Sequence, residues 1–266
     1  MDSKKALVVI SFGSTFDETR THDIGGIEQA LAAAFPAYDQ YRAFTSTVIR
    51  KRLAARGINI DDTETVLQKL QANGYEEIIL QPTHLLHGEE FEQKVLSLKE
   101  KYTNSFKKII ISQPLIVSEA DYKLAAAAIA AQLPPLAEQE GVVLMGHGTP
   151  RNNNKAHGYT YVKLQEIFDA MHLPVVVGTV EDEDTPNFKI VLEQVKKRGY
   201  KHVHMYPLMV VAGDHANNDM YGDEADSWKA QIEELGIKTT GHLCGLGRTK
   251  AIQALYIQHV LSALSI

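Results

Sequence analysis

Residues 74–90 read GYEEIILQPTHLLHGEE, and residues 199–215 read GYKHVHMYPLMVVAGDH. Laid over one another without a gap, the two stretches share a Gly-Tyr pair, a central proline and a glycine followed by polar side chains. A second pair of segments also matches, because residues 8–14 can be laid over residues 143–149. These internal matches indicate that the chain consists of two copies of one structural unit.

Outside the matched stretches, short apolar segments alternate with helical patterns. Predicted strands lie at residues 7–10, 38–44, 78–80 and 109–111 in the first half, and at 142–145, 175–177 and 203–206 in the second, followed by a weak strand near His242. Strands that alternate with helices are typical of parallel sheets. We therefore expect an α/β fold with two similar four-stranded parallel-sheet halves that face a central cleft.

The boundary between the halves is predicted from composition. Pro134-Pro135 and the polar residues 137–140 have the character of a linker. The expected domains are therefore an N-terminal α/β half at residues 1–136 and a C-terminal α/β half at residues 137–266.

Composition excludes several classes of protein. The chain has 266 residues, a formal net charge of −6 and one cysteine. The acidic balance argues against nucleic-acid binding through a global basic field. No internal disulfide can form, no stretch approaches the roughly 18 apolar residues of a membrane span, and no signal-type cleavage region follows Met1. We expect a cytoplasmic protein without a nucleic-acid or membrane partner; homo-oligomerisation stays open.

Differences between the matched loops point to chemistry, because open α/β sheets bind ligands at the carboxyl ends of their strands. Phe12 in the first half corresponds to His147 in the second, and Glu90 corresponds to His215. Glu181 follows another strand at the same end of the second half. Two imidazoles with nearby carboxylates and no thiolate suit a borderline divalent ion, such as Co²⁺, Ni²⁺, Fe²⁺ or Zn²⁺, in a partly open site.

Each of these residues also has a purely structural interpretation. His147 between two glycines fits a turn or a helix cap, and His215 fits a polar turn. Glu90 fits a favourable position at a helix N-terminus, and Glu181 opens an acidic run that is typical of a solvated helix start.

The other histidines divide into two groups. His84 and His87 stand three residues apart just before Glu90, where they can line the same cleft. His202 and His204 alternate along one strand, which favours packing or surface roles. No Walker-type loop, His-Glu-x-x-His pair or strand-turn-helix serine elbow occurs in the sequence.

Five pieces of the sequence carry a resemblance to a known family: Ser11-Phe12-Gly13-Ser14, Phe44-Thr45-Ser46, residues 84–90, Met145-Gly146-His147-Gly148 and residues 207–220. Together they resemble the anaerobic cobalt chelatases, which are the sirohydrochlorin cobaltochelatases of the class II chelatase superfamily that includes ferrochelatase. The likeness extends from the first strand to Gly245-Leu246-Gly247, and Gly-Asp-His-Ala-x-Asn-Asp is its most specific piece.

The resemblance implies an enzyme that inserts Co²⁺ into the tetrapyrrole sirohydrochlorin without ATP, in an early step toward cobalamin. It implies Co²⁺ as the substrate metal and no organic cofactor. Carried over by motif, His147 and Glu90 are the expected catalytic residues that remove pyrrole protons. The expected metal ligands are His147, Glu181 and His215, and the residues leave open whether His147 serves mainly as base or as ligand.

Four further residues are expected to contact the tetrapyrrole. Phe12, His84 and His87 belong to the loops that carry the resemblance. Arg151 follows the Gly-His-Gly segment closely and is a candidate cation for the carboxylates of the substrate, although a surface role in solubility fits it equally well.

Two other functions remain as alternatives. A ferrochelatase-like enzyme would insert Fe²⁺ or Ni²⁺ into sirohydrochlorin or a porphyrin, and insertion rates across metals and rings would distinguish it. A non-catalytic tetrapyrrole or metal carrier would bind its ligand stoichiometrically without turnover.

Overall fold

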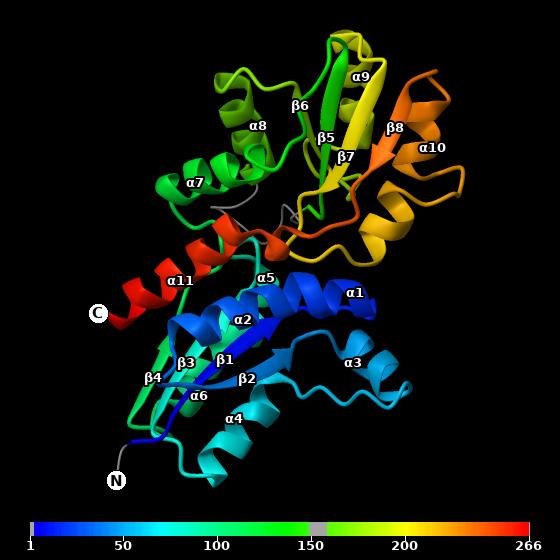
Figure 1. Cartoon of the computed structure of the whole chain (residues 1–266). Coiled ribbons are helices and arrows are strands. Elements are labelled where there is room, and N and C mark those ends of the chain that lie inside the picture. Colours follow the sequence, from blue (N-terminus) through cyan, green and yellow to red (C-terminus); the bar gives the residue numbers. More distant parts are fainter. Residues whose placement is uncertain (1–2, 149–158, 266) are drawn as a thin grey trace. The chain divides into compact units, whose positions relative to one another are not determined.

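The computed structural model describes residues 3–148 and 159–265 of the chain (Figure 1). It contains two compact units: unit 1 comprises Met1–Asp121 and Gly247–Ile266, and unit 2 comprises Tyr122–Leu246. None of the described helices is long and apolar enough to cross a bilayer.

The division into units differs from the predicted boundary at residues 136 and 137, because the last helix packs on unit 1. Arg248 Nε donates to Oδ1 of Asp23 at 2.7 Å, and Asp23 is fully buried. The hydroxyl of the buried Tyr256 donates to the carbonyl of Thr83 at 2.9 Å. A buried carboxylate is costly without a partner, so these contacts hold the C-terminal helix to the first unit.

Unit 1 is a parallel sheet in the strand order β2-β1-β3-β4. Its strands are β1 (Lys5–Ser11), β2 (Asp39–Phe44), β3 (Glu77–Pro82) and β4 (Lys108–Ile111). Its helices are α1 (Asp17–Thr19), η1 (Arg20–Ile24), α2 (Gly25–Ala34), α3 (Thr47–Ala54), α4 (Thr63–Ala72), α5 (Glu89–Phe91), η2 (Glu92–Leu96), α6 (Ser97–Tyr102) and α11 (Lys250–Leu264).

Unit 2 is a parallel sheet in the strand order β6-β5-β7-β8. Its strands are β5 (Glu140–Gly146), β6 (Val175–Thr179), β7 (His202–Pro207) and β8 (Lys238–Gly241). Its helices are α8 (Thr160–Ala170), α9 (Phe188–Arg198), η4 (Ala216–Met220) and α10 (Trp228–Glu233), and α7 (Glu119–Ala130) leads into it; the 3₁₀ turn η5 (Leu246–Arg248) leads back to unit 1.

The two sheets confirm the predicted α/β class and the predicted duplication. In each, the first strand pairs with the second and third, and the fourth strand lies outside the third. The matched glycines share their backbone conformation as well: φ is 107° at Gly13 and 106° at Gly148, and 73° at Gly74 and 70° at Gly199. The internal sequence match therefore reflects a repeated fold.

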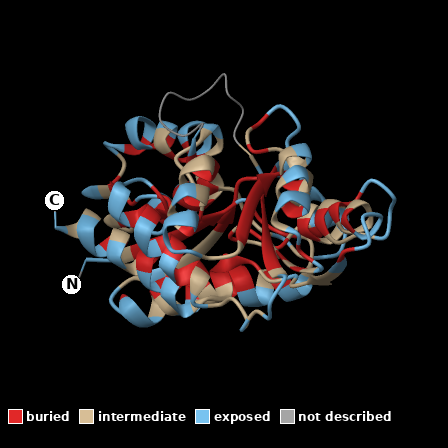
Figure 2. Cartoon of the chain, turned by 90° about the horizontal axis from the view of Figure 1, so that it is seen from above, coloured by how far each residue is buried: buried red, intermediate tan, exposed pale blue. Residues whose placement is uncertain are grey.

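Burial follows the sequence pattern, with one informative exception. The strands are mostly buried, while the outer faces of the helices are exposed (Figure 2). Covering a parallel sheet on both faces requires continuous apolar strands, and β3 is buried from Ile78 to Pro82. Residues of its counterpart β7 instead alternate between partly exposed and buried, with His202, His204 and Tyr206 on the partly exposed face. One face of β7 is therefore open to polar chemistry.

Candidate metal centre

The Gly-His-Gly segment after β5 is shaped by two side chains that press on its backbone. A Cβ atom added to Gly146 would lie 2.1 Å from the ring of the buried Tyr161, and one added to Gly148 would lie 2.9 Å from Cγ of Glu181. Gly148 also has a positive φ, which side chains other than glycine adopt at a cost. Both glycines are therefore needed to place His147 at the carboxyl end of β5.

His147, His215 and Glu181 lie together in unit 2. The ring centroids of the two histidines are 4.8 Å apart, and their planes are nearly perpendicular at 84°. Nδ1 of His147 lies 3.9 Å from Oε1 of Glu181. About half of each of these two side chains is exposed, at 52% and 50%. His147 thus lies close to both of the other residues predicted as metal ligands, in a partly open part of unit 2.

Asp219 is a member of this cluster that the sequence analysis did not single out. Its Oδ2 lies 2.6 Å from Nδ1 of His215, four residues earlier on the π-helical turn η4. A carboxylate on one ring nitrogen orients a histidine and directs the other nitrogen to a metal. The spacing of four residues, which is one helical turn, was the available signal in the sequence.

The surroundings of His147 favour its neutral form. Burial lowers its pKa below the usual value, and the neighbouring His215 lowers it further, whereas Glu181 acts in the opposite direction. A neutral imidazole carries the lone pair that either a metal ligand or a base needs.

Phe12, Glu90, His84 and His87 belong to unit 1, where β1 and β3 are adjacent parallel strands. Phe12 follows β1 and is 53% exposed, and Glu90 lies half-buried in α5. His87 lies 3.2 Å from Glu92 and packs edge-on against Phe91. These residues share one edge of the sheet of unit 1.

His84 is the most enclosed histidine of this group. Both of its ring nitrogens are buried, and neither has a hydrogen-bond partner within the described part of the chain. Burial lowers the pKa of His84 to about 4, so the ring is neutral at pH 7. Arg151 lies outside the described residues.

In chemical terms, the cluster in unit 2 offers two imidazoles and the carboxylate of Glu181, with Asp219 supporting His215. Nitrogen and oxygen donors of this kind suit Co²⁺, Ni²⁺, Fe²⁺ and Zn²⁺.

The model of one protein family, cobalt chelatase (CbiK), matches residues 5–265. The chain belongs to this family. It is similar to the sirohydrochlorin cobaltochelatase of Salmonella typhimurium, with 39% identity over 263 residues that cover 98% of this chain and 97% of the relative. It is also similar to the sirohydrochlorin cobaltochelatase CbiKC of Nitratidesulfovibrio vulgaris, with 27% identity over 99% of this chain and 92% of the relative.

Solved structures show the same fold at low sequence identity. SirB from Bacillus subtilis with Fe³⁺ aligns with a TM-score of 0.60 and 16% identity, covering 98% of this chain and 95% of that one. CbiX, described as the terminal enzyme for biosynthesis of siroheme in denitrifying bacteria, aligns with a TM-score of 0.53 and 14% identity, covering 97% and 99%. The chelatase fold predicted from the sequence is therefore confirmed for this member of the cobalt chelatase family.

Proposed function

We propose that this chain is a cytoplasmic enzyme that inserts Co²⁺ into sirohydrochlorin without ATP, giving cobalt-sirohydrochlorin in an early step toward cobalamin. The observation that carries the proposal is the pairing of the His147 and His215 rings at 4.8 Å beside Glu181, in a chain that matches the cobalt chelatase model from residue 5 to 265. The names of its two curated relatives support the choice of metal and ring.

The reaction exchanges two pyrrole N–H protons for one Co²⁺ ion, so charge balances if both protons leave the ring. His215 and Glu181 would hold the ion, with Asp219 fixing the orientation of the His215 ring. His147 would accept a proton from a pyrrole N–H of the tetrapyrrole, since the lowered pKa of His147 keeps its imidazole neutral. The imidazolium that forms would be stabilised by Glu181, whose Oε1 lies 3.9 Å from Nδ1.

Glu90 is the residue we propose for assistance with the second proton. It is a carboxylate at the start of α5 in unit 1, at the position that corresponds to His215 in the repeat. A well-placed base accelerates proton transfer by about 10²–10⁴-fold.

Substrate binding is assigned to four residues. Phe12 offers an exposed aromatic ring and His87 a partly exposed imidazole from the segment after β3, where His84, whose ring nitrogens are buried, would support that segment. Arg151 offers a cation for the carboxylates of sirohydrochlorin. Distorting a bound planar ring to expose its nitrogens costs roughly 1–5 kcal/mol, which contacts of this kind would have to supply.

The test is a metal-insertion assay on the purified full chain with sirohydrochlorin, no ATP, and Co²⁺, Fe²⁺ or Ni²⁺ as the metal. We expect the highest kcat/KM with Co²⁺, and a decrease of at least about 10–100-fold in His215→Ala, because a proposed metal ligand is lost. Asp219→Asn should raise the KM for Co²⁺ by about 10–100-fold, because it removes the support of a ligand. The exposed His172, replaced by Asn, is the matched control and should leave the rate unchanged.

Other results would overturn the proposal in recognisable ways. Faster insertion of Fe²⁺ or Ni²⁺ would indicate a ferrochelatase-like specificity. Stoichiometric binding of sirohydrochlorin without turnover would indicate a carrier. A wild-type insertion rate in His215→Ala would show that the group of His147, His215 and Glu181 does not take part in the reaction.

A further inference from the structure

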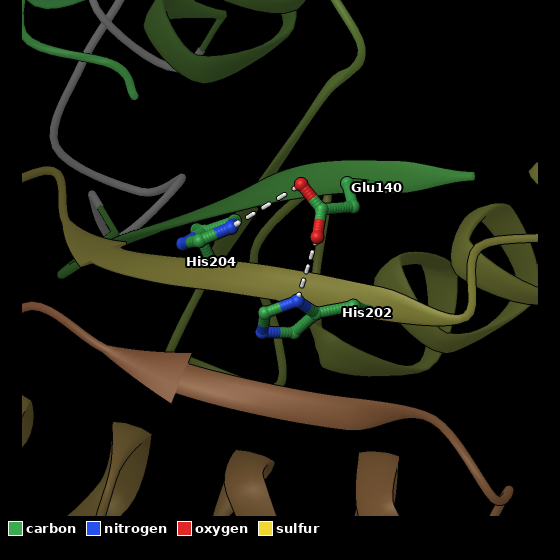
Figure 3. Close-up of side chains that lie close together, drawn as sticks. All are labelled: Glu140, His202 and His204. Carbon is green, nitrogen blue, oxygen red and sulfur yellow. Dashed lines mark hydrogen bonds and ion pairs between the residues drawn. The ribbon is translucent and has the colours of Figure 1, made fainter. Parts of the chain in front are cut away.

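A second group of metal-binding side chains lies in unit 2, away from the cluster around His147. Glu140 stands at the start of β5 and is paired with His202 on β7, and His204 follows on the same face of β7 (Figure 3). One ring nitrogen from each histidine and one oxygen of Glu140 all lie within 4.8 Å of one another. All three side chains are partly buried, so their positions are constrained by the sheet.

This group is separate from the candidate catalytic cluster. Glu140 is the first residue of the seven-residue strand β5, whereas His147 follows its last residue. At about 3.3 Å per residue, the two ends of the strand lie roughly 20 Å apart. The two groups cannot share one ion.

The hydrogen bonds of the two imidazoles fit metal binding. Nδ1 of His202 faces Oε1 of Glu140 at 3.0 Å, and its other nitrogen, Nε2, lies 2.8 Å from the hydroxyl of Thr240. Nε2 of His204 faces Oε2 of Glu140 at 3.9 Å, and its Nδ1 lies 3.1 Å from Nε2 of His242. Each ring therefore turns one nitrogen to the carboxylate, and its other nitrogen has a partner that can accept a hydrogen bond from the N–H, as in metal-bound histidines.

Further contacts hold the outer members of the group in place. The backbone N–H of Ala137 donates to Oε2 of Glu140 at 2.9 Å, which fixes the carboxylate. The ring of His242 stacks on Tyr206, with parallel planes 4.1 Å apart between centroids. The side chains are thus oriented in advance, which lowers the entropy lost when an ion binds.

The repeat provides an internal comparison. Lys5 and Glu77, the counterparts of Glu140 and His202 in unit 1, form a salt bridge at 2.8 Å. Ile79, the counterpart of His204, is fully buried. The fold therefore does not require histidines at these positions, since unit 1 has an ion pair and an apolar residue there. Unit 2 instead carries three side chains of the types that bind metals.

We propose that Glu140, His202 and His204 form a second binding site for a borderline divalent ion such as Co²⁺, Ni²⁺ or Zn²⁺, with Thr240 and His242 as supporting hydrogen-bond partners. Two imidazoles and a carboxylate are donors that these ions prefer. A bound ion links the start of β5 to β7 and so stabilises unit 2. The inference stands independently of the proposed chelatase activity, because it rests on other residues.

The test is equilibrium dialysis of the full chain against Co²⁺, and separately Zn²⁺, combined with thermal unfolding. We expect two ions per wild-type chain, one in His147→Ala/His215→Ala, one in His204→Gln, and none in the triple variant. Zn²⁺ should raise the unfolding temperature of His147→Ala/His215→Ala, because an ion that binds only the folded state stabilises it. That rise should vanish when His204→Gln is added.

Glu140→Gln is the second variant, since it keeps the size of the side chain and removes its negative charge; it should lose the same ion. The neighbouring exposed Glu138, replaced by Gln, is its matched control and should retain both ions. No bound ion in His147→Ala/His215→Ala, or an ion that persists there after His204→Gln is added, would overturn the second site. Loss of insertion activity without loss of this ion would bear only on the proposed chelatase function.

Discussion

The loops that follow β1 and β5 have the same backbone and different chemistry. Gly13 and Gly148 adopt φ values of 107° and 106° in the two loops. The exposed residue before the glycine is Phe12 in unit 1 and His147 in unit 2. Duplication therefore kept the turn that presents a side chain at the strand end, and the presented group diverged. The comparison shows that the fold provides the position, whereas the side chain provides the function.

The largest expected effect comes from making the two loops alike. His147→Phe gives unit 2 the side chain of unit 1, and we expect kcat/KM for Co²⁺ insertion to fall by about 10²–10⁴-fold, because a base and ligand is lost. Phe12→His, the reciprocal change, should alter kcat/KM by only about tenfold, since the imidazole keeps a planar ring at this position and a changed apolar contact of roughly 1–1.5 kcal/mol corresponds to that factor. Absorbance of the tetrapyrrole during insertion measures both rates, and unfolding temperatures confirm that both variants fold. Equal losses in the two variants would contradict the division of roles.

A smaller effect is expected from the glycines themselves. Gly13→Ala and Gly148→Ala each place a Cβ at positive φ, which costs about 1–2 kcal/mol in the free energy of unfolding. The added Cβ meets the ring of Phe44 in unit 1 and the side chain of Glu181 in unit 2. Only Gly148→Ala disturbs a proposed metal ligand, so we expect it alone to weaken Co²⁺ binding, by about tenfold.

Calorimetric titration with Co²⁺ and denaturant unfolding of the two alanine variants measure these quantities. Similar losses of stability with a loss of affinity only in Gly148→Ala would sharpen the comparison. Unchanged Co²⁺ affinity in Gly148→Ala would show that Glu181 does not depend on this close approach.

The sequence allowed much of the fold to be predicted, because its strongest signals are local. Short β-branched strands and the gap-free repeat predicted two four-stranded parallel sheets, and both sheets are observed. The C-terminal helix was expected in the second half, but it belongs to unit 1, where Arg248, just before the helix, contacts the buried Asp23, 225 residues earlier in the chain. No local pattern encodes such a contact.

The candidate site was predicted in part for the same reason. His147 and His215 stand at strand ends that the repeat identifies, Glu181 follows another strand at the same end, and the structure places both His215 and Glu181 beside His147. Asp219 was missed because its role depends on how η4 turns. Glu140 was interpreted as part of a linker, and the structure instead makes it the first residue of β5, beside His202. Strand pairing, which the sequence alone did not give, brings these two together.

The smallest expected effect is a shift in pH dependence that tests the electrostatics of His147. Burial and then His215 lower its pKa, and Glu181 opposes them by favouring the cation. A histidine that must be neutral loses activity as the pH falls through its pKa, so the acid limb of kcat/KM should lie below about pH 6.5. Glu181→Gln removes the anion, which lowers the pKa further and should move this limb to lower pH by less than about one unit.

The pH at which kcat/KM falls on the acid side can be measured separately from the maximal kcat/KM. The maximal value also decreases in Glu181→Gln if Glu181 binds the metal. The exposed Glu183, two residues further along the chain and replaced by Gln, is the matched control and should leave the limb in place. A limb that moved to higher pH in Glu181→Gln would mean that Glu181 does not favour the protonated form of His147. If the acid limb moved equally in both variants, the shift would reflect the net charge of the acidic segment. The Debye length at physiological salt is about 8 Å, so nearby charges act on His147 whichever residue carries them. Only a shift confined to Glu181→Gln identifies His147 as the titrating group and Glu181 as its partner, and unit 1, with Phe12 at the matched position, has no equivalent of this pair.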